Sequence, residues 1–327
     1  MKQNPGGTDS PWKARDFTTQ LPSLDADLQT DVCIVGGGIS GMTTAYLLAR
    51  EGRSVVVLDD GPIGGGETGR TTAHLSNAFD DRYYEVERLF GERGSRLIAE
   101  SHTAAIDRIE DIIRDEQIEC DFDRVDGYLF VPPDCSNDVL EREIAAARRA
   151  GLQIVEWVDR APINDFDTGR CLRFPRQAQF DPLKYIDGLV RGTLQHNGCV
   201  YSHTHADEIR GGCVSTSNGH IVTATAVVAA TNAAVNDSIL LSTRESKYRS
   251  YVIGAYVPRG SVTKALYWDT ADPYHYVRIQ SEDNDDILIV GGEDERVGEH
   301  DDGDQRFAEL YRWTRKRFPM IGRIEFC

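Results

Sequence analysis

Three glycines near the start of the chain have the spacing of a turn that binds a dinucleotide. They form the pattern G-x-G-x-x-G and are Gly36, Gly38 and Gly41. An apolar run over 32–35 leads into them, helix-forming residues follow over 42–51, and a second apolar run over 54–58 ends in Asp59. In a βαβ unit, such glycines allow a tight turn, close approach of the backbone to a pyrophosphate, and close packing of helix against strand. We therefore predict a site that holds phosphates at the helix N-terminus, where free N–H groups and the helix dipole attract anions.

Asp59 stands where a carboxylate can accept hydrogen bonds from the ribose diol of the nucleotide. Its charge would repel a 2′-phosphate, which argues against a phosphorylated ribose. The segment that follows, 61–69, contains five glycines. This composition predicts a second loop whose backbone amides face the cofactor, and the alternative is a flexible surface loop.

The remaining chain combines helical runs with short strands. Helix formers over 82–117 carry an apolar stripe that Gly91 and Gly94 are expected to interrupt. An Asp126-Gly127 turn is expected to divide the strand-like residues over 120–131 into a hairpin. Further helices are predicted over 138–150, 181–197 and 304–318, and further strands over 152–158, 199–230 and 248–290.

The order of these elements predicts the α/β fold class, with a Rossmann-like nucleotide-binding domain interleaved with a β-rich (α+β) substrate domain. The predicted parts are an N-terminal arm over 1–27, a nucleotide-binding domain over 28–80 and 180–245, and a helical linker plus β-rich domain over 81–179 and 246–327.

Composition argues against several other classes of protein. A net charge of −17 opposes binding to nucleic acid or to anionic lipid. No apolar run has the length of a membrane span, and residues 1–30 lack the apolar core of a signal peptide, so we predict a cytoplasmic protein. The seven cysteines include no C-x-x-C pair, and we predict no metal site. The G-x-S-x-G and H-E-x-x-H motifs are absent, which argues against a hydrolase.

Five ordered blocks give the chain a resemblance to a known family. They are TDVCIVGGGISG (30–41), GRTTAHL (69–75), QAQFDPLKY (177–185), PYHYVR (273–278) and GGED (291–294). With these blocks the chain resembles the FAD-dependent oxidoreductases of the D-amino-acid oxidase (DAO) class, which includes glycine oxidase, sarcosine oxidase and D-amino-acid dehydrogenases. It is most similar to the bacterial subgroup that carries a Rieske iron–sulfur domain at its C-terminus.

The resemblance implies FAD as the cofactor and assigns it a set of residues. These are Gly36, Gly38, Ser40, Gly41, Asp59, Arg70, Thr71, Thr72, Ala73, Ala206, Ala230, Thr231 and Asn232. It implies that the loop over 70–75 runs along the pyrophosphate and the flavin edge. It also implies that the backbone of Ala206 contacts adenine and that residues 230–232 close over the nucleotide.

Two features depart from the family pattern. The subgroup usually has His at the positions of Asp181 and Glu295, which are acidic here. The family also completes its FAD site with a segment that would lie beyond Cys327, and Rieske ligands would follow that segment. We therefore expect a C-terminally truncated chain that by itself binds flavin weakly or not at all. A 2Fe–2S cluster is expected only in a C-terminal domain absent from this chain.

The chemistry implied by the resemblance is transfer of a hydride from a substrate Cα to flavin N5. A substrate carboxylate would be held by an arginine fork, and Arg278 is the candidate, with Tyr276 on the same strand face because the two positions are two apart. His74 is the candidate beside the flavin. The alternatives are that Arg278 is a surface residue and that His74 caps a turn.

The resulting hypothesis is an FAD-dependent oxidoreductase that oxidises a small amine or amino acid. A βαβ unit alone does not distinguish FAD from NAD, so one alternative is an NAD-dependent dehydrogenase. The other alternative is a non-catalytic nucleotide-binding or electron-transfer subunit. The sequence leaves open the substrate, the electron acceptor and the oligomeric state.

Overall fold

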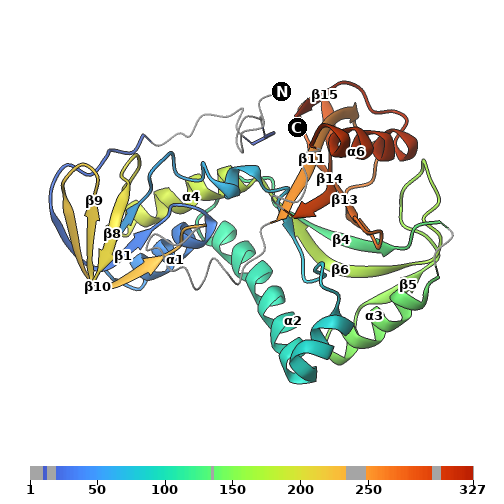
Figure 1. The fold of residues 1–327 in the computed structure, drawn as a ribbon, viewed down its shortest axis with the longest axis horizontal. Coiled ribbons are helices and arrows are strands. Elements are labelled where there is room, and N and C mark those ends of the chain that lie inside the picture. The colour runs from blue at the N-terminus through green and yellow to red at the C-terminus, as the bar shows by residue number, and fades with distance from the viewer. Residues whose placement is uncertain (1–9, 13–19, 134–135, 233–247, 297–302, 327) are drawn as a thin grey trace.

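The computed structural model describes residues 10–12, 20–133, 136–232, 248–296 and 303–326, which form two β-sheets with their helices (Figure 1). The strands of the smaller sheet are β1 (Leu28–Val35), β2 (Val55–Leu58), β7 (Cys199–Tyr201), β8 (Ala206–Arg210), β9 (Cys213–Thr216) and β10 (Ile221–Ala229). Their order is β7-β2-β1-β10-β9-β8. The first four are parallel, and β9 and β8 are antiparallel to their neighbours.

In the smaller sheet, β2 and the end of β1 are buried on both faces. Ile34 and Val57 pack in one apolar cluster with helices α1 (Ile39–Arg50) and α4 (Pro182–Gln195), whereas Cys33 and Leu58 pack in another with β8, β9 and β10. Successive side chains of a strand point to opposite faces, so a strand buried on both sides is a continuous apolar run. This is why the two strands of the predicted βαβ unit, β1 and β2, were evident from the sequence.

The larger sheet has nine strands. They are β3 (His74–Leu75), β4 (Asp123–Phe130), β5 (Glu156–Val158), β6 (Cys171–Gln179), β11 (Tyr248–Pro258), β12 (Leu266–Asp269), β13 (His275–Ser281), β14 (Asp285–Arg296) and β15 (Ile324–Phe326). The order is β15-β11-β14-β13-β12-β4-β6-β3, and β5 also pairs with β6. All of these pairs are antiparallel except β4 with β12.

Helices cover the larger sheet unequally. Helix α6 (Gly303–Arg317) lies on one face, where Leu310 packs with Val290 of β14. Helices α2 (Tyr83–Asp115) and α3 (Asp138–Arg149) cover part of the other face. On that face Ile287 and Ile289 of β14 join the cluster of α1 and α4. The second face of the larger sheet is therefore turned toward the smaller sheet (Figure 1).

The structure confirms the α/β fold class and corrects several predicted elements. Asp126-Gly127 is not a hairpin turn, because β4 continues through it and pairs with β6. Gly127 serves close packing instead, since a Cβ there would lie 2.4 Å from the Trp268 ring. The strand predicted over 152–158 is only β5, and β6 was not predicted at all. Residues 74–75 pair with the larger sheet although they fall within the segment 28–80.

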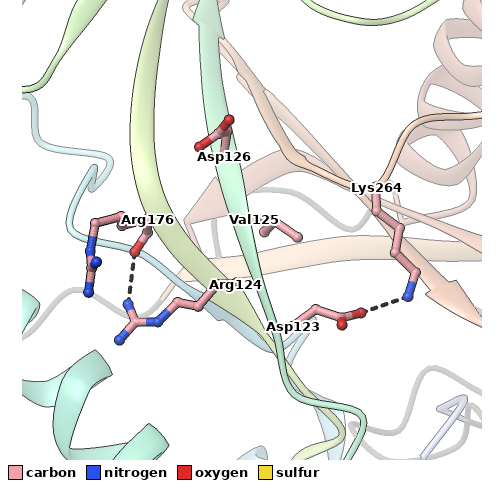
Figure 2. Close-up of a pocket in the computed structure, with 6 residues that line it drawn as sticks. All are labelled: Asp123, Arg124, Val125, Asp126, Arg176 and Lys264. Carbon is pink, nitrogen blue, oxygen red and sulfur yellow. Dashed lines mark hydrogen bonds and ion pairs between the residues drawn. The ribbon is translucent and has the colours of Figure 1, made fainter.

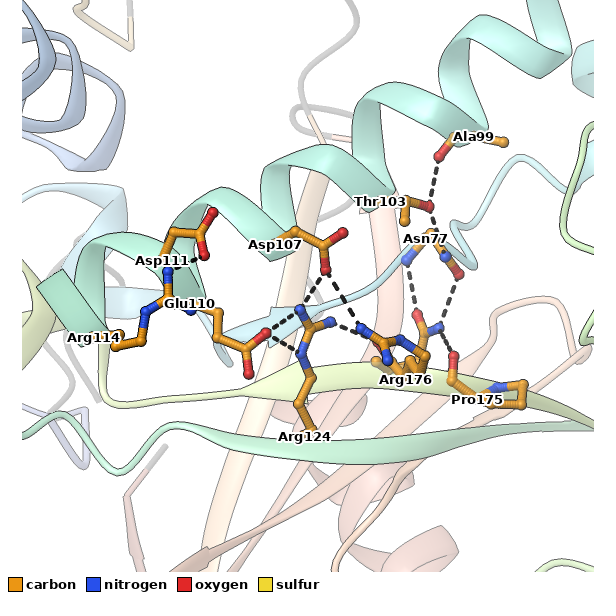
Figure 3. Close-up of polar contacts among 11 residues, drawn as sticks. Asn77, Ala99, Thr103, Asp107, Glu110, Asp111, Arg114, Arg124, Pro175 and Arg176 are labelled. Carbon is orange, nitrogen blue, oxygen red and sulfur yellow. Dashed lines mark hydrogen bonds and ion pairs between the residues drawn. The ribbon is translucent and has the colours of Figure 1, made fainter.

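The long helix α2 is interrupted at Gly91, as the sequence predicted, but the predicted interruption at Gly94 is wrong, because the helix continues through it. Gly91 has φ 70° and ψ 171°, a conformation outside the helical region. C-terminal to this kink, α2 contacts the larger sheet through Arg124 of β4. The Arg124 guanidinium pairs with Asp107 of α2 at 2.5 Å and with Glu110 of α2 at 2.6 Å (Figure 3). None of the helices in the described ranges combines the length and the apolar character needed to cross a lipid bilayer.

A buried amide network fixes the chain just after β3 (Figure 3). The Gln177 side chain accepts hydrogen bonds from the Asn77 amide and the Ser76 hydroxyl, both at 2.8 Å. Its Nε2 donates to Asn77 Oδ1 at 2.9 Å, and Asn77 donates in turn to Thr103 of α2 at 3.0 Å. This network ties β3, β6 and α2 together and so positions His74.

Asp181 is the N-cap of α4, and its removal tests how that helix is anchored. Its Oδ1 accepts from the Leu183 amide at 3.0 Å and the Lys184 amide at 3.1 Å. Asp181→Ala is expected to unfold more easily than Asp181→Asn by about 1 kcal/mol, because Asn keeps the cap and both variants lose the charge. Urea unfolding of the two variants measures this difference, and coincident curves would show that the cap is not what Asp181 supplies.

Candidate functional site

The predicted glycine turn lies between the carboxyl end of β1 and the start of α1. Gly36 has φ +107°, and a Cβ there would lie 2.5 Å from the Ala230 carbonyl oxygen. A Cβ at Gly41 would lie 1.8 Å from the Gly36 carbonyl oxygen. Neither position accepts a side chain without movement of the backbone. The same packing brings Ala230 and Thr231 against the turn, with the exposed Asn232 following them.

Helix α1 begins with unsatisfied donors. The Ile39 amide donates to Thr68 Oγ1 at 3.0 Å, but the Ser40 and Gly41 amides have no acceptor among the residues that the structure describes. The N-cap is Gly38, which brings no capping side chain. Such a helix start favours an anion, because the first N–H groups lack partners and the dipole is positive there.

A second loop meets this helix start. Thr68 belongs to the short 3₁₀-helix η1 (Glu67–Arg70), so its bond to Ile39 places η1 beside the first turn of α1. Arg70, which ends η1, has a buried Nε without a hydrogen-bond partner in the described part of the chain. An unpartnered buried guanidinium N–H and free helix amides together fit a pyrophosphate.

Asp59 joins the two glycine loops to each other. Its Oδ2 accepts from the Gly37 amide at 2.6 Å, and its Oδ1 accepts from the Gly61 amide at 2.9 Å. Burial raises the pKa of Asp59, and these two hydrogen bonds oppose that shift. Each carboxylate oxygen keeps a second lone pair, so a ribose diol could still bind there. The Thr204 amide donates to the Asp59 carbonyl at 2.7 Å, which brings the start of β8 at Ala206 close by.

Arg278 lies on the second face of the larger sheet and is fully buried, so its interpretation as a surface residue is wrong. Nη1 donates to the carbonyls of Thr72 at 3.2 Å, Ala73 at 3.0 Å and Phe180 at 3.1 Å, and Nη2 donates to the Gln280 side chain. No carboxylate of the described residues forms an ion pair with it. Burial lowers the pKa of Arg278 to about 9, and more distant Asp charges oppose the shift.

His74 lies next to this guanidinium. In β3 it pairs with Gln179 of β6, its Nδ1 lies 3.1 Å from Thr72 Oγ1, and its Nε2 is buried without a partner among the described residues. Burial, followed by the positive charge of Arg278, lowers the pKa of His74 to about 3. The imidazole is therefore neutral at physiological pH. Its ring meets that of Tyr276 edge-on, with centroids 5.4 Å apart.

Tyr276 shares the strand face of Arg278, as the alternation of β13 predicted. Burial, and next the charge of Asp294, raises the pKa of the Tyr276 phenol, so the hydroxyl keeps its proton. Neighbouring Tyr274 donates to Asp80 at 2.9 Å. The structure thus brings the three predicted catalytic candidates His74, Tyr276 and Arg278 onto one face.

Three buried polar atoms on this face lack partners among the described residues. They are His74 Nε2, Gln179 Oε1 and Arg278 Nε. Gln179 is 1% exposed, and its Nε2 donates to the Ile279 carbonyl at 2.7 Å, next to Arg278. Buried polar groups are almost always hydrogen-bonded, so this cluster indicates a polar ligand. A flavin ring with polar edges, or a substrate carboxylate and amine, carries the complementary groups.

Sequence reasoning missed Gln179 and Trp268. Trp268 pairs with Tyr276 across β12 and β13, and its ring centroid lies 6.2 Å from that of His74. The alternation of Gln177 and Gln179 was the available signal, because two amides on one strand face are unusual in a core. The two acidic departures are structural: Asp181 caps α4, and Glu295 accepts a hydrogen bond from the Tyr251 hydroxyl on the α6 side.

A separate open pocket of about 420 Å³ lies along β4 (Figure 2). It is lined by Asp123, Arg124, Val125, Asp126, Arg176 and Lys264. Lys264 pairs with Asp123 at 2.6 Å, and the Arg124 charge is already neutralised by α2. None of the predicted site residues lines it. Among the described residues no group of His, Cys, Asp and Glu side chains is arranged to hold a metal ion.

Comparisons with known proteins give the family of the chain. A family model described as FAD dependent oxidoreductase (DAO) matches residues 31–327. The chain is 29% identical over 333 residues to the Bacillus subtilis (strain 168) protein YhfW, which is named as a Rieske 2Fe-2S iron-sulfur protein; the match covers 96% of this chain and 65% of YhfW. It is 29% identical over 225 residues to gamma-glutamylputrescine oxidoreductase of Escherichia coli (strain K12), covering 66% of this chain and 52% of that protein. The chain therefore spans 52% to 65% of the length of these relatives.

Solved structures share the fold. Glycine oxidase from Geobacillus kaustophilus matches with a TM-score of 0.69 and 18% identity, over 92% of this chain and 81% of that one. L-proline dehydrogenase from P. horikoshii matches with a TM-score of 0.67 and 18% identity, over 91% and 80% of the two chains.

Proposed function

Because the chain belongs to the FAD dependent oxidoreductase (DAO) family, we propose that it oxidises a small amine or amino acid, with FAD supplying the hydride acceptor N5. One observation carries the proposal. A fully buried Arg278 with an unpartnered Nε lies beside a neutral His74, on the sheet face that is turned toward the smaller sheet.

The first half of the proposal concerns how this chain would hold FAD. The free amides of α1 and the Arg70 guanidinium would bind the pyrophosphate, and Asp59 would bind the adenosine ribose. Residues 71–73 would lie along the flavin edge, Ala206 would contact adenine, and residues 230–232 would cover the nucleotide. Support comes from the cradle at Gly36 and Gly41, which is closed to side chains but borders free donors.

The second half concerns the substrate. A substrate carboxylate would receive the Arg278 Nε–H, and its charge would offset a guanidinium that has no carboxylate of its own. Neutral His74 would offer Nε2 as a hydrogen-bond partner to the flavin or the amine. Tyr276 would line the site on the same face. The amine must reach the flavin uncharged to release hydride, and a desolvated site next to a buried cation favours the neutral amine.

Two observations bear on the alternatives. The family model is one of FAD enzymes, which argues against an NAD-dependent dehydrogenase. An electron-transfer subunit is supported only by the name of YhfW. The amine or amino-acid class is supported by the names of relatives with gamma-glutamylputrescine, glycine or L-proline as substrate. Three further points are part of the proposal: the division into a nucleotide domain and a substrate domain, a cytoplasmic location, and an iron–sulfur cluster outside residues 1–327. The proposal names no electron acceptor.

The test is anaerobic mixing of the FAD-loaded product of the complete reading frame with a panel of amines, amino acids and 2-hydroxy acids. The proposal predicts that at least one amine or amino acid bleaches the flavin absorbance. Bleaching by hydroxy acids alone, or by NADH alone, would contradict it.

The pH profile gives a prediction for His74. Its folded pKa of about 3 lies far below working pH, so the ring stays neutral and does not change its charge between pH 5 and 9. His74→Asn is therefore expected to lower kcat about tenfold or more through a lost hydrogen bond, without moving any inflection of the profile. An inflection near neutral pH that disappears in His74→Asn would show that the ring titrates during turnover.

A further inference from the structure

We propose that Trp12, in the N-terminal arm, is a positioning residue of the flavin-facing site and acts through Arg278 and residues 71–73. Trp12 is 2% exposed, and its indole contacts residues far from it in sequence. Its indole Nε1 donates to the Thr71 carbonyl at 2.7 Å. Its ring lies over the Arg278 guanidinium, with Cζ 5.3 Å from the ring centroid.

The contact between Trp12 and Arg278 stabilises a buried positive charge. Arg278 is a buried cation without an ion-pair partner in the described residues, and only carbonyls and one amide oxygen receive its donors. The negative face of an indole attracts a cation, and more strongly away from water. Trp12 therefore stabilises the guanidinium without using its N–H groups, which leaves Nε free for a ligand.

The contact with Thr71 acts on a strained loop. Ala73 has φ +57°, a left-handed conformation that an alanine rarely adopts and that needs support from its surroundings. That support comes from both sides. Arg278 holds the Thr72 and Ala73 carbonyls, the Ala73 amide donates to Thr71 Oγ1 at 3.1 Å, and Trp12 holds the Thr71 carbonyl.

The conformation of residues 71–73 also affects His74. His74 follows Ala73 directly, so the direction of its ring depends on the conformation that Trp12 and Arg278 hold. An ordinary core tryptophan would only fill volume, and any large apolar residue could replace it. Trp12 uses both its π face and its N–H, so a variant that loses only the N–H (Trp12→Phe) and one that loses both (Trp12→Leu) separate these roles.

The test uses the product of the complete reading frame with Trp12→Phe and Trp12→Leu. Trp157→Leu is the matched control, because Trp157 also lies over an arginine, with Arg170 Cζ at 4.2 Å, but on β5. The first readout is amide hydrogen exchange at residues 73–75 in flavin-free protein. Trp12→Leu is expected to accelerate it about tenfold and Trp12→Phe about threefold, with no change in Trp157→Leu. Unchanged exchange in Trp12→Leu, or equal acceleration in Trp157→Leu, would overturn the proposal.

The second readout is steady-state kinetics, which rests on the proposed function. Trp12→Leu is expected to raise KM for a carboxylate-bearing amine about tenfold while kcat falls less, with partial recovery in Trp12→Phe. A positioning role would be contradicted if, in both variants, kcat fell by as large a factor as KM rose. Faster exchange without any amine oxidation would defeat the proposed function and leave the role of Trp12 in holding the loop intact. If Trp12→Leu does not fold, Trp12→Phe decides alone, and unchanged exchange at Ala73 in that variant overturns the proposal.

Discussion

Arg278→Met is expected to lower kcat/KM for a carboxylate-bearing amine on the order of 10²- to 10³-fold and to destabilise the fold by about 3–5 kcal/mol. The substitution leaves the carbonyls of Thr72, Ala73 and Phe180 and the Gln280 side chain without their donor in a buried site. Kinetics and urea unfolding measure the two effects separately. Arg278→Lys keeps a cation and some donors but loses the planar fork, so it is expected to recover more stability than activity.

Arg173→Met is the matched control for this prediction. Arg173 lies on β6 of the same sheet and pairs with Asp126 of β4 and Glu156 of β5, but its side chain is 35% exposed. Its loss is expected to change stability by about 1 kcal/mol or less, because exposed ion pairs contribute little. Equal effects of the two substitutions would show that burial of Arg278 has no special role.

The lowered pKa adds a pH signature. Arg278 loses its proton as pH rises through about 9 in the ligand-free protein, so KM for a carboxylate substrate is expected to rise above that pH. The stability effect has the opposite sign. The folded chain releases this proton more readily than the unfolded chain, so the penalty for burying the charge falls as pH rises above 9. A KM for such a substrate that stays flat up to pH 10 would place the carboxylate elsewhere.

Gly41→Ala is expected to weaken FAD binding on the order of 100-fold, which is about 3 kcal/mol. The new methyl group would lie 1.8 Å from the Gly36 carbonyl oxygen, so the turn and α1 must separate. Separation moves the free amides away from the pyrophosphate they would hold. Titration of the flavin-free product of the complete reading frame, followed by flavin fluorescence, measures the affinity.

Gly66→Ala is the control in the second glycine-rich loop. No heavy atom lies within 4 Å of the Cβ it would add, and its φ of −79° is outside the left-handed region that favours glycine. Its affinity for FAD is expected to stay within about threefold of the parent protein. A Gly41→Ala variant that binds FAD as tightly as Gly66→Ala would show that the turn is not the pyrophosphate site.

The sequence predicted those parts of the site that depend on local geometry. The turn at Gly36 and Gly41 and the acid at Asp59 follow from the rules of a single βαβ unit. The strand face shared by Tyr276 and Arg278 follows from simple alternation. Alternation does not say which face of a strand is buried, so the sequence could not decide whether Arg278 lies inside or outside.

The remaining parts depend on contacts between distant segments. Pro175 and Arg176 oppose a single residue of β4, and Arg176 has φ +61°, so β6 carries a bulge that breaks its alternation. This hid the strand. Gly127 resembled a turn because its real requirement, the Trp268 ring, lies far away in sequence. The role of Trp12 is likewise defined only by residues that the fold brings to it.

Competition between ADP and FAD for the product of the complete reading frame tests the central claim most directly. ADP carries the adenine, ribose and diphosphate that α1, the glycine turn and Asp59 would hold, and it lacks the flavin. The account predicts that ADP displaces FAD from a single site and that riboflavin binds far more weakly than FAD. A protein that binds riboflavin as tightly as FAD, and is indifferent to ADP, would contradict the account.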